Sequence, residues 1–269
     1  MSSSSARSDM RRALAVALLA ALPAVGCAGP VSEADAGGAR IHHDIGVNAF
    51  ERGDLRGALR ELLVAADLDP NLPQTENALG LVFHAMGRSK DALAHYEKAL
   101  ALKPGYSEAH NNFGILLVDL GRYDEAIEHF NTALADILYA TPWLAEGNLG
   151  WALYKKGDVE AGKLRLRNAV AQNPKFCRGY EWLARIGIET GDAAEAVASW
   201  KRFEKHCLGD AAIARTLAPE YVREMRWYLG MAYLKQGDRE AARSAFAACA
   251  AAEDGSDFGT RCAQSLRGL

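Results

Sequence analysis

The chain has 269 residues, of which 49% are hydrophobic and 24% are charged, and its formal net charge is −3. This composition provides enough apolar side chains for a sizeable core, and it excludes a disulfide mini-protein, a collagen-like chain and global disorder. The small acidic surplus gives no support to a nucleic-acid partner. No apolar run reaches the length of an ordinary transmembrane helix.

Residues 1–26 have the layout of a secretory signal. Three arginines between residues 7 and 12 precede an apolar stretch over 13–25, which is too short to cross a bilayer. The stretch ends in the sequence AVGC, whose last residue is Cys27, and small residues before a cysteine resemble the lipobox of bacterial lipoproteins. This resemblance implies cleavage before Cys27 and attachment of lipid to it. The alternative is ordinary secretion with an incidental Cys27.

The residues after the signal predict a flexible tether and the membrane to which the protein is sorted. Residue 28 is alanine rather than aspartate, which within the lipoprotein resemblance implies sorting to the outer membrane, facing the periplasm. Residues 27–38 contain glycine, proline, serine and alanine with little apolar content, so we expect a flexible tether between the lipid and a folded domain.

The rest of the chain is dominated by an internal spacing of 34 residues. At four positions the same residue type recurs every 34 residues through three units. These residues are Gly46, Gly80 and Gly114; Gly53, Gly87 and Gly121; Ala58, Ala92 and Ala126; and Ala65, Ala99 and Ala133. The step and the residue types resemble tetratricopeptide (TPR) repeats, in which each unit is a pair of antiparallel helices. Glycine at the eighth position and alanine at the twentieth would let the paired helices approach closely.

The phase of the repeat predicts an all-α fold, a right-handed α-solenoid over residues 39–269. We expect six repeats, a two-residue insertion at 141–142 and a longer insertion at 211–222. A capping helix over 257–269 would cover the apolar face of the last repeat. The repeats are predicted at 39–72, 73–106, 107–140, 143–176, 177–210 and 223–256.

Four cysteines remain after Cys27, and an even number in an exported chain favours disulfides. Cys177 opens the first helix of repeat five and Cys207 closes its second helix, so antiparallel packing brings them together. Cys249 would face the capping helix that carries Cys262. We therefore predict the pairs 177–207 and 249–262 among three possible connectivities; free buried thiols are the alternative.

The sequence contains no motif for catalysis. A Gly-rich phosphate loop, a GxSxG elbow and the CxxC or HExxH ligand spacings are all missing, so we expect no enzyme, no metal, no cofactor and no small-molecule substrate. The alternative, an unrecognised site in the 211–222 insertion, would have only Arg215 and Glu220 as charged groups. A repeat array of this kind is expected to bind a segment of a partner protein.

The repeat phase also locates a candidate binding groove, because positions two, five, nine, twelve and thirteen of each first helix point to the concave side. Large and mostly apolar residues occupy positions nine and twelve, where a solvated face would be polar. Asparagine at position five resembles the backbone-clamping asparagine of peptide-binding TPR proteins. Alternatively, the tether or closure of the superhelix covers these residues. The predicted groove comprises Val47, Phe50, Asn77, Leu81, His84, Asn111, Ile115, Val118, Trp151 and Tyr154.

Several longer stretches resemble the PilF/PilW/Tgl family of type IV pilus pilotins. They are NNFG at 111–114, GRYDEA at 121–126, FNTAL at 130–134 and NLGWALYKKGD at 148–158, together with the interruption after repeat three. The resemblance implies an outer-membrane lipoprotein that promotes the insertion and multimerisation of the PilQ-type secretin, its partner. A general periplasmic TPR adaptor for cell-wall or outer-membrane machinery is the alternative.

Overall fold

The computed structural model describes residues 31–250 and 256–269, so the signal sequence and Cys27 lie outside the described residues. Within this part the protein is entirely helical, as predicted. Its elements are α1 (Glu33–Glu51), α2 (Leu55–Leu68), α3 (Pro73–Ala85), α4 (Ser89–Leu102), α5 (Ser107–Asp119), α6 (Tyr123–Ala135), α7 (Pro142–Lys156), α8 (Val159–Gln172), α9 (Cys177–Thr190), α10 (Ala193–Phe203), the π-helical turn η1 (Glu204–Leu208), α11 (Ala211–Ala214), α12 (Pro219–Lys235), α13 (Arg239–Ala250) and α14 (Asp257–Arg267).

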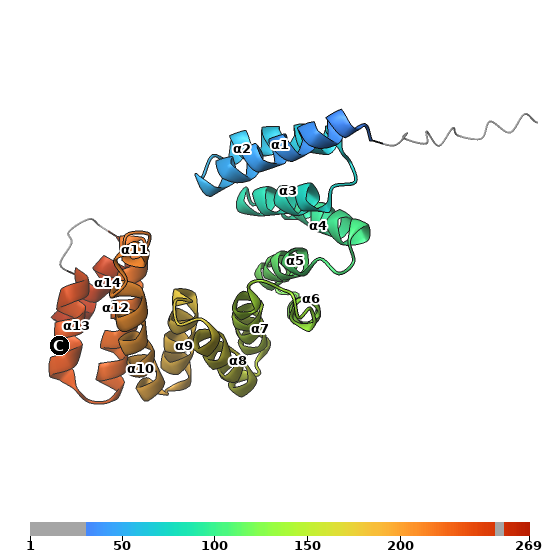
Figure 1. The fold of residues 1–269 in the computed structure, drawn as a ribbon. Coiled ribbons are helices and arrows are strands. Elements are labelled where there is room, and N and C mark those ends of the chain that lie inside the picture. Colours follow the sequence, from blue (N-terminus) through green and yellow to red (C-terminus); the bar gives the residue numbers. More distant parts are fainter. Residues whose placement is uncertain (1–30, 251–255) are drawn as a thin grey trace, which may run out of the picture.

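The helices form antiparallel pairs that follow one another along a curved array (Figure 1). The pairs are α1 with α2, α3 with α4, α5 with α6, α7 with α8, α9 with α10 and α12 with α13. Close contacts also join α1 to α3, α3 to α5, α5 to α7 and α7 to α9. The first helices therefore line the inner, concave side of the array.

Glycines at two repeat positions shape each pair. The turn inside every pair contains a glycine with positive φ, a conformation that side chains with a Cβ rarely adopt: Gly53, Gly87, Gly121, Gly157, Gly191 and Gly237. At the eighth position, a Cβ added to Gly114 would lie 2.5 Å from the ring of Phe130 on the second helix. The absence of a side chain at Gly114 thus allows the ring to pack against the backbone of α5.

Two element boundaries differ from those expected. Helix α1 begins at Glu33, so residues 33–38, which we assigned to the tether, are helical; the side chain of Ser32 caps this helix by accepting from the amide of Asp35. Helix α12 begins at Pro219, so residues 219–222 of the predicted insertion form its first turn. Proline is well tolerated there because the first turn needs no donor from its backbone nitrogen. Part of the remaining insertion forms the short helix α11.

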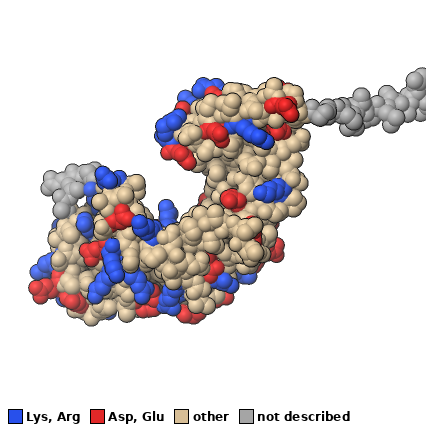
Figure 2. Space-filling model, viewed as in Figure 1, with Lys and Arg blue, Asp and Glu red and all other residues tan. Residues whose placement is uncertain are grey.

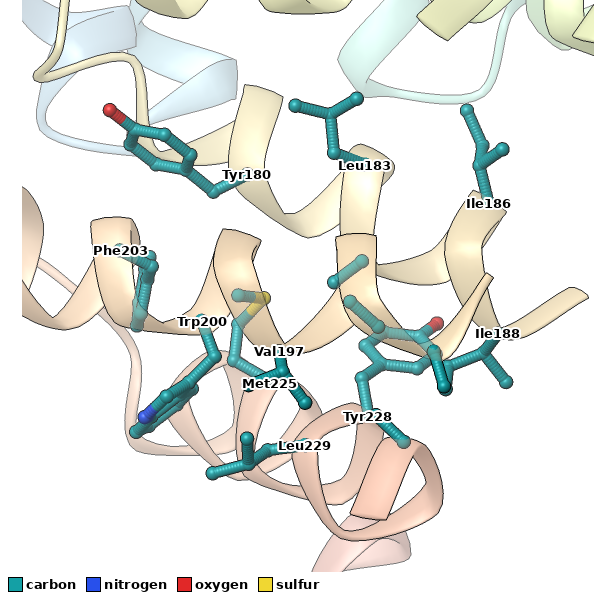
Figure 3. Close-up of a cluster of buried hydrophobic side chains, with 14 of the residues drawn as sticks. Tyr180, Leu183, Ile186, Ile188, Val197, Trp200, Phe203, Met225, Tyr228 and Leu229 are labelled. Carbon is teal, nitrogen blue, oxygen red and sulfur yellow. The ribbon is translucent and has the colours of Figure 1, made fainter. Parts of the chain in front are cut away.

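The largest buried cluster runs from repeat four to repeat six. Leu183 of α9, Phe203 of α10 and Met225 of α12 are fully buried in it, and the Trp200 ring lies beside them (Figure 3). A second cluster runs through repeats one to four and includes Leu79 and Phe130. The continuous burial from one pair to the next is what holds a repeat array together, since each pair contacts only its neighbours.

The C-terminal end of the array is covered. Helix α14 packs against α13, where Phe246 is fully buried. Both predicted disulfides are present: Cys249 bonds to Cys262 of α14, and Cys177 of α9 bonds to Cys207 of η1. Their Cα atoms lie 5.9 and 6.0 Å apart, within the usual range for disulfides.

The N-terminal end is open over the described residues. Ile41 and Ile45, at positions three and seven of the first repeat, are 61% and 45% exposed. Leu79, at position seven of the second repeat, is fully buried because the preceding pair covers it. No helix within residues 31–250 and 256–269 is both long and apolar enough to cross a membrane.

Candidate functional site

The concave face carries a row of large side chains that are neither buried nor fully exposed. It comprises the residues predicted at positions nine and twelve: Val47, Phe50, Leu81, His84, Ile115, Val118, Trp151 and Tyr154. We call this set the concave row. Four of its members, Val47, Phe50, Ile115 and Val118, pack on one side against the core of repeats one to four. Their remaining surface is available to a partner.

The two asparagines predicted as clamps are engaged within the array. Asn77 and Asn111 are buried. The Asn77 side-chain oxygen accepts from Asn112 Nδ2 at 3.1 Å, and the Asn111 oxygen accepts from Asn148 Nδ2 at 2.9 Å. Each bond joins position five of one first helix to position six of the next. These amides therefore fix the spacing of the helices beneath the groove.

Ion-pairing and hydrogen-bonding side chains also link successive repeats along the concave row. His84 Nε2 lies 2.8 Å from Asp119 Oδ2, and the Tyr154 hydroxyl donates to the carboxylate of Glu189. Both links connect position twelve of one repeat to position thirteen of the next. Burial and the nearby Glu189 charge raise the pKa of Tyr154 to about 12, so its hydroxyl stays protonated at neutral pH.

A pocket of about 330 Å³ opens between α5, α7 and α9. Ile115, Val118 and Trp151 of the concave row contribute to its wall, and Trp182 and Arg185 complete the side formed by α9. The Trp151 and Trp182 rings are stacked, with centroids 5.2 Å apart. The guanidinium carbon of Arg185 lies 5.2 Å from the centroid of Trp151, a cation–π distance. The pocket thus combines flat aromatic surface with charged side chains of both signs, since Asp119 and Glu181 also line it.

A buried acid lies at the base of this pocket. Burial raises the pKa of Glu181 to about 7, although the guanidinium of Arg178, 3.5 Å away, opposes the shift. The Arg178 guanidinium carbon also lies 6.0 Å from the centroid of Trp182. The charge of this end of the groove therefore changes close to neutral pH.

Sequence reasoning missed Arg178, Glu181, Trp182 and Arg185, although part of the signal was present. Arg178, Glu181 and Arg185 stand at positions two, five and nine of repeat five, the same positions that point into the groove in earlier repeats. The predicted groove ended at repeat four, so the residues of repeat five at these positions were not included. Trp182 stands at position six and is brought to the groove by its stacking on Trp151.

No group of three or more His, Cys, Asp and Glu side chains in residues 31–250 and 256–269 could hold a metal ion. His42 and His43 are directed to different partners, Glu61 and Thr75, as their adjacency on one helix implies. The arrangement suits recognition of an apolar or aromatic segment of another protein.

Comparison with known families agrees with the helix pairs. Models described as tetratricopeptide repeat match residues 73–136, 148–202 and 224–254. The chain is a tetratricopeptide-repeat protein. No curated protein matches its sequence.

Solved structures resemble this TPR protein over most of its length. The structure of PilW, described as a widely conserved type IV pilus biogenesis factor, is 22% identical with a TM-score of 0.73, and the match covers 83% of this chain and 97% of that one. The PilF structure from Pseudomonas aeruginosa is 20% identical with a TM-score of 0.70, covering 87% and 100%. YrrB, described as a TPR protein with an unusual peptide-binding site, is 17% identical with a TM-score of 0.53, covering 76% and 97%. At these identities the likeness establishes the shared fold.

Proposed function

We propose that this protein is an outer-membrane lipoprotein pilotin. In this proposal Cys27 carries the lipid, the folded array faces the periplasm, and the concave row binds a PilQ-type secretin and promotes its insertion and multimerisation for type IV pilus assembly. The observation that carries the proposal is the concave row itself, a line of partly exposed large side chains on a fold that resembles PilW over 83% and PilF over 87% of this chain.

The concave row suits this task because secretin monomers must hide apolar surface before they join a ring. A groove lined by Leu81, Ile115 and Trp151 would bury an amphipathic segment of the monomer and prevent its aggregation. Lipid anchoring would concentrate loaded monomers at the membrane, where assembly occurs. No nucleotide is required for this mechanism.

The first experiment compares detergent-resistant secretin multimers in outer-membrane fractions with and without the protein. Loss of multimers while monomer persists is the expected result. A normal amount of secretin multimers in the deletion strain would contradict the pilotin function and leave the general adaptor as the remaining hypothesis. Complementation with Cys27→Ser tests the anchor separately, since the groove remains intact.

A double variant tests the groove. Leu81→Glu with Ile115→Glu is expected to abolish secretin capture and multimer formation while leaving the helical circular dichroism unchanged. The matched control is Leu63→Glu with Leu164→Glu, which places the same charges on exposed leucines of the second helices α2 and α8. Full activity of the groove variant would rule out this face as the binding surface.

A further inference from the structure

A second hollow lies away from the concave row, between α8, α10 and η1. Its volume is about 650 Å³, and cationic side chains dominate its lining: Arg167, Lys201, Arg202 and Lys205, with His206 and the ring of Tyr180. Val170 and Ala198 supply apolar surface in the lining. We call this feature the basic hollow. In Figure 2, Lys and Arg side chains lie over the C-terminal half of the array with Asp and Glu side chains among them.

The charge of the basic hollow is not compensated. Its lining holds four Lys and Arg side chains and one carboxylate, Glu195, which gives a local charge of +3 in a chain whose net charge is −3. Glu195 is engaged by Arg167. Lys201, Arg202 and Lys205 are exposed and have no carboxylate within ion-pair distance among residues 31–250 and 256–269. Such an arrangement raises the local concentration of anions.

The cations converge on a small volume. Lys201 and Lys205 are four residues apart, as are Arg202 and His206, so each pair projects from one side of the same helical stretch across the junction of α10 and η1. Beside them the His206 ring stacks on Tyr180, with centroids 6.4 Å apart. The Tyr180 hydroxyl donates to the carbonyl of Pro174 at 3.1 Å, and this bond orients the ring.

The backbone that carries these groups is fixed. Lys205 and His206 lie in a π-helical turn, a feature that is frequent at functional sites. The next residue, Cys207, is fully buried and bonded to Cys177 at the start of α9. The disulfide therefore holds the basic hollow in place before any ligand arrives, which lowers the entropy lost on binding.

We propose that the basic hollow binds a phosphate-bearing ligand. Several cations that converge on a compact volume match a compact multivalent anion, whereas an acidic peptide would need an extended groove. The phosphate can belong to a phospholipid head group or to a soluble phosphate compound. This inference is independent of the secretin and of the concave row.

Calorimetry of the purified full chain in uncharged detergent tests the proposal. The probes are inorganic pyrophosphate and short-chain phosphatidylglycerol, with short-chain phosphatidylcholine for comparison. Lys201→Gln with Lys205→Gln is expected to weaken binding at least about tenfold, because two of the converging charges are lost. Lys90→Gln with Lys235→Gln, which removes two exposed lysines from α4 and α12, is the matched control and should bind as the unmodified chain does.

The outcomes separate the sources of phosphate. Tighter binding of phosphatidylglycerol than of pyrophosphate assigns the site to a lipid head group, and the reverse assigns it to soluble phosphate. Absence of binding to both probes overturns the proposal. An equal loss of affinity in the control variant and in the Lys201→Gln, Lys205→Gln variant also overturns it. Binding of an oligoglutamate peptide without phosphate binding would instead identify a surface for an acidic protein segment and also overturn it.

The disulfide supplies a second variant. Cys177→Ser with Cys207→Ser, after circular dichroism confirms that it is folded, is expected to weaken phosphate binding while leaving all cations present. Unchanged affinity in that variant would show that the hollow is not preorganised by η1.

Discussion

The Nδ1 atoms of His110 and His129 lie 2.8 Å apart, joining the two helices of the third repeat. Position four of the first helix meets position 23 of the second in this pair. The same positions pair a histidine with a carboxylate elsewhere, as in His42 with Glu61 and His95 with Glu76. Only in the third of these repeats do two histidines meet.

This pair predicts a loss of stability in mild acid. His110 Nε2 lies 2.9 Å from the carbonyl of Pro104, so Nε2–H donates there and Nδ1 accepts from His129. Burial lowers the pKa of His129 from 6.5 to about 4. Between pH 6.5 and pH 4, residue 129 is protonated in the unfolded chain but not in the folded one. Its contribution to the free energy of unfolding is therefore fully present above pH 6.5 and is lost as the pH falls towards 4. The expected loss is about 1–2 kcal/mol, since His129 is only half-buried.

Urea unfolding at pH 7.5 and pH 5 measures this effect. His129→Glu restores the His–Glu pairing of the first two repeats, and it should remove the loss at pH 5 contributed by this site. His206→Gln controls for the loss of a histidine elsewhere. If the free energy of unfolding depends on pH identically in the unmodified protein and in His129→Glu, this histidine pair does not cause the loss of stability.

Glycine at the eighth repeat position predicts a steric cost. Gly114→Ala would place a Cβ 2.5 Å from the Phe130 ring, and we expect a destabilisation of about 1–3 kcal/mol in denaturant unfolding. Gly105→Ala is the control, because its added Cβ meets no atom within 4 Å. Equal stability of the two variants would mean that the α5–α6 pair adapts without strain.

The first two repeats predict unequal costs for truncation of the side chain at position seven. Leu79→Ala, at position seven of the second repeat, removes a fully buried side chain and should cost about 2–5 kcal/mol. Ile45→Ala, at position seven of the first repeat, should cost less than about 1 kcal/mol, because its side chain is 45% exposed. Thermal and urea unfolding compare them. Similar costs would mean that something covers the N-terminal end in solution.

The disulfides predict a dependence on redox conditions. Replacing Cys177 and Cys207 together with serine should lower the free energy of unfolding by about 3–4 kcal/mol, and the same change at Cys249 and Cys262 by about 3 kcal/mol, in the chain-entropy model. Urea midpoints with and without a reductant measure both. A midpoint that does not respond to the reductant would contradict the stabilising role of the crosslinks.

The 34-residue step predicted the helix pairs, the turns and the disulfide partners, because each of these depends on where the helices begin and end along the chain. Side-chain links between the first helices of adjacent repeats were harder to predict. The Asn77–Asn112 and His84–Asp119 links span 35 residues, while Asn111–Asn148 spans 37 because the insertion at 141–142 adds two. Asn111 resembles a clamp for a partner's backbone in sequence, yet the next helix occupies its oxygen. Such pairings depend on how adjacent repeats are rotated, which no single position encodes.

Both crosslinks lie in the last two repeats and the cap, whereas the described part of repeats one to four is held by packing, hydrogen bonds and ion pairs and contains no disulfide. The whole concave row therefore belongs to a part of the array whose contacts do not depend on the oxidation state of a thiol. The basic hollow lies beside the Cys177–Cys207 bond, so a reducing solution would release the backbone of the hollow while the concave row kept its shape.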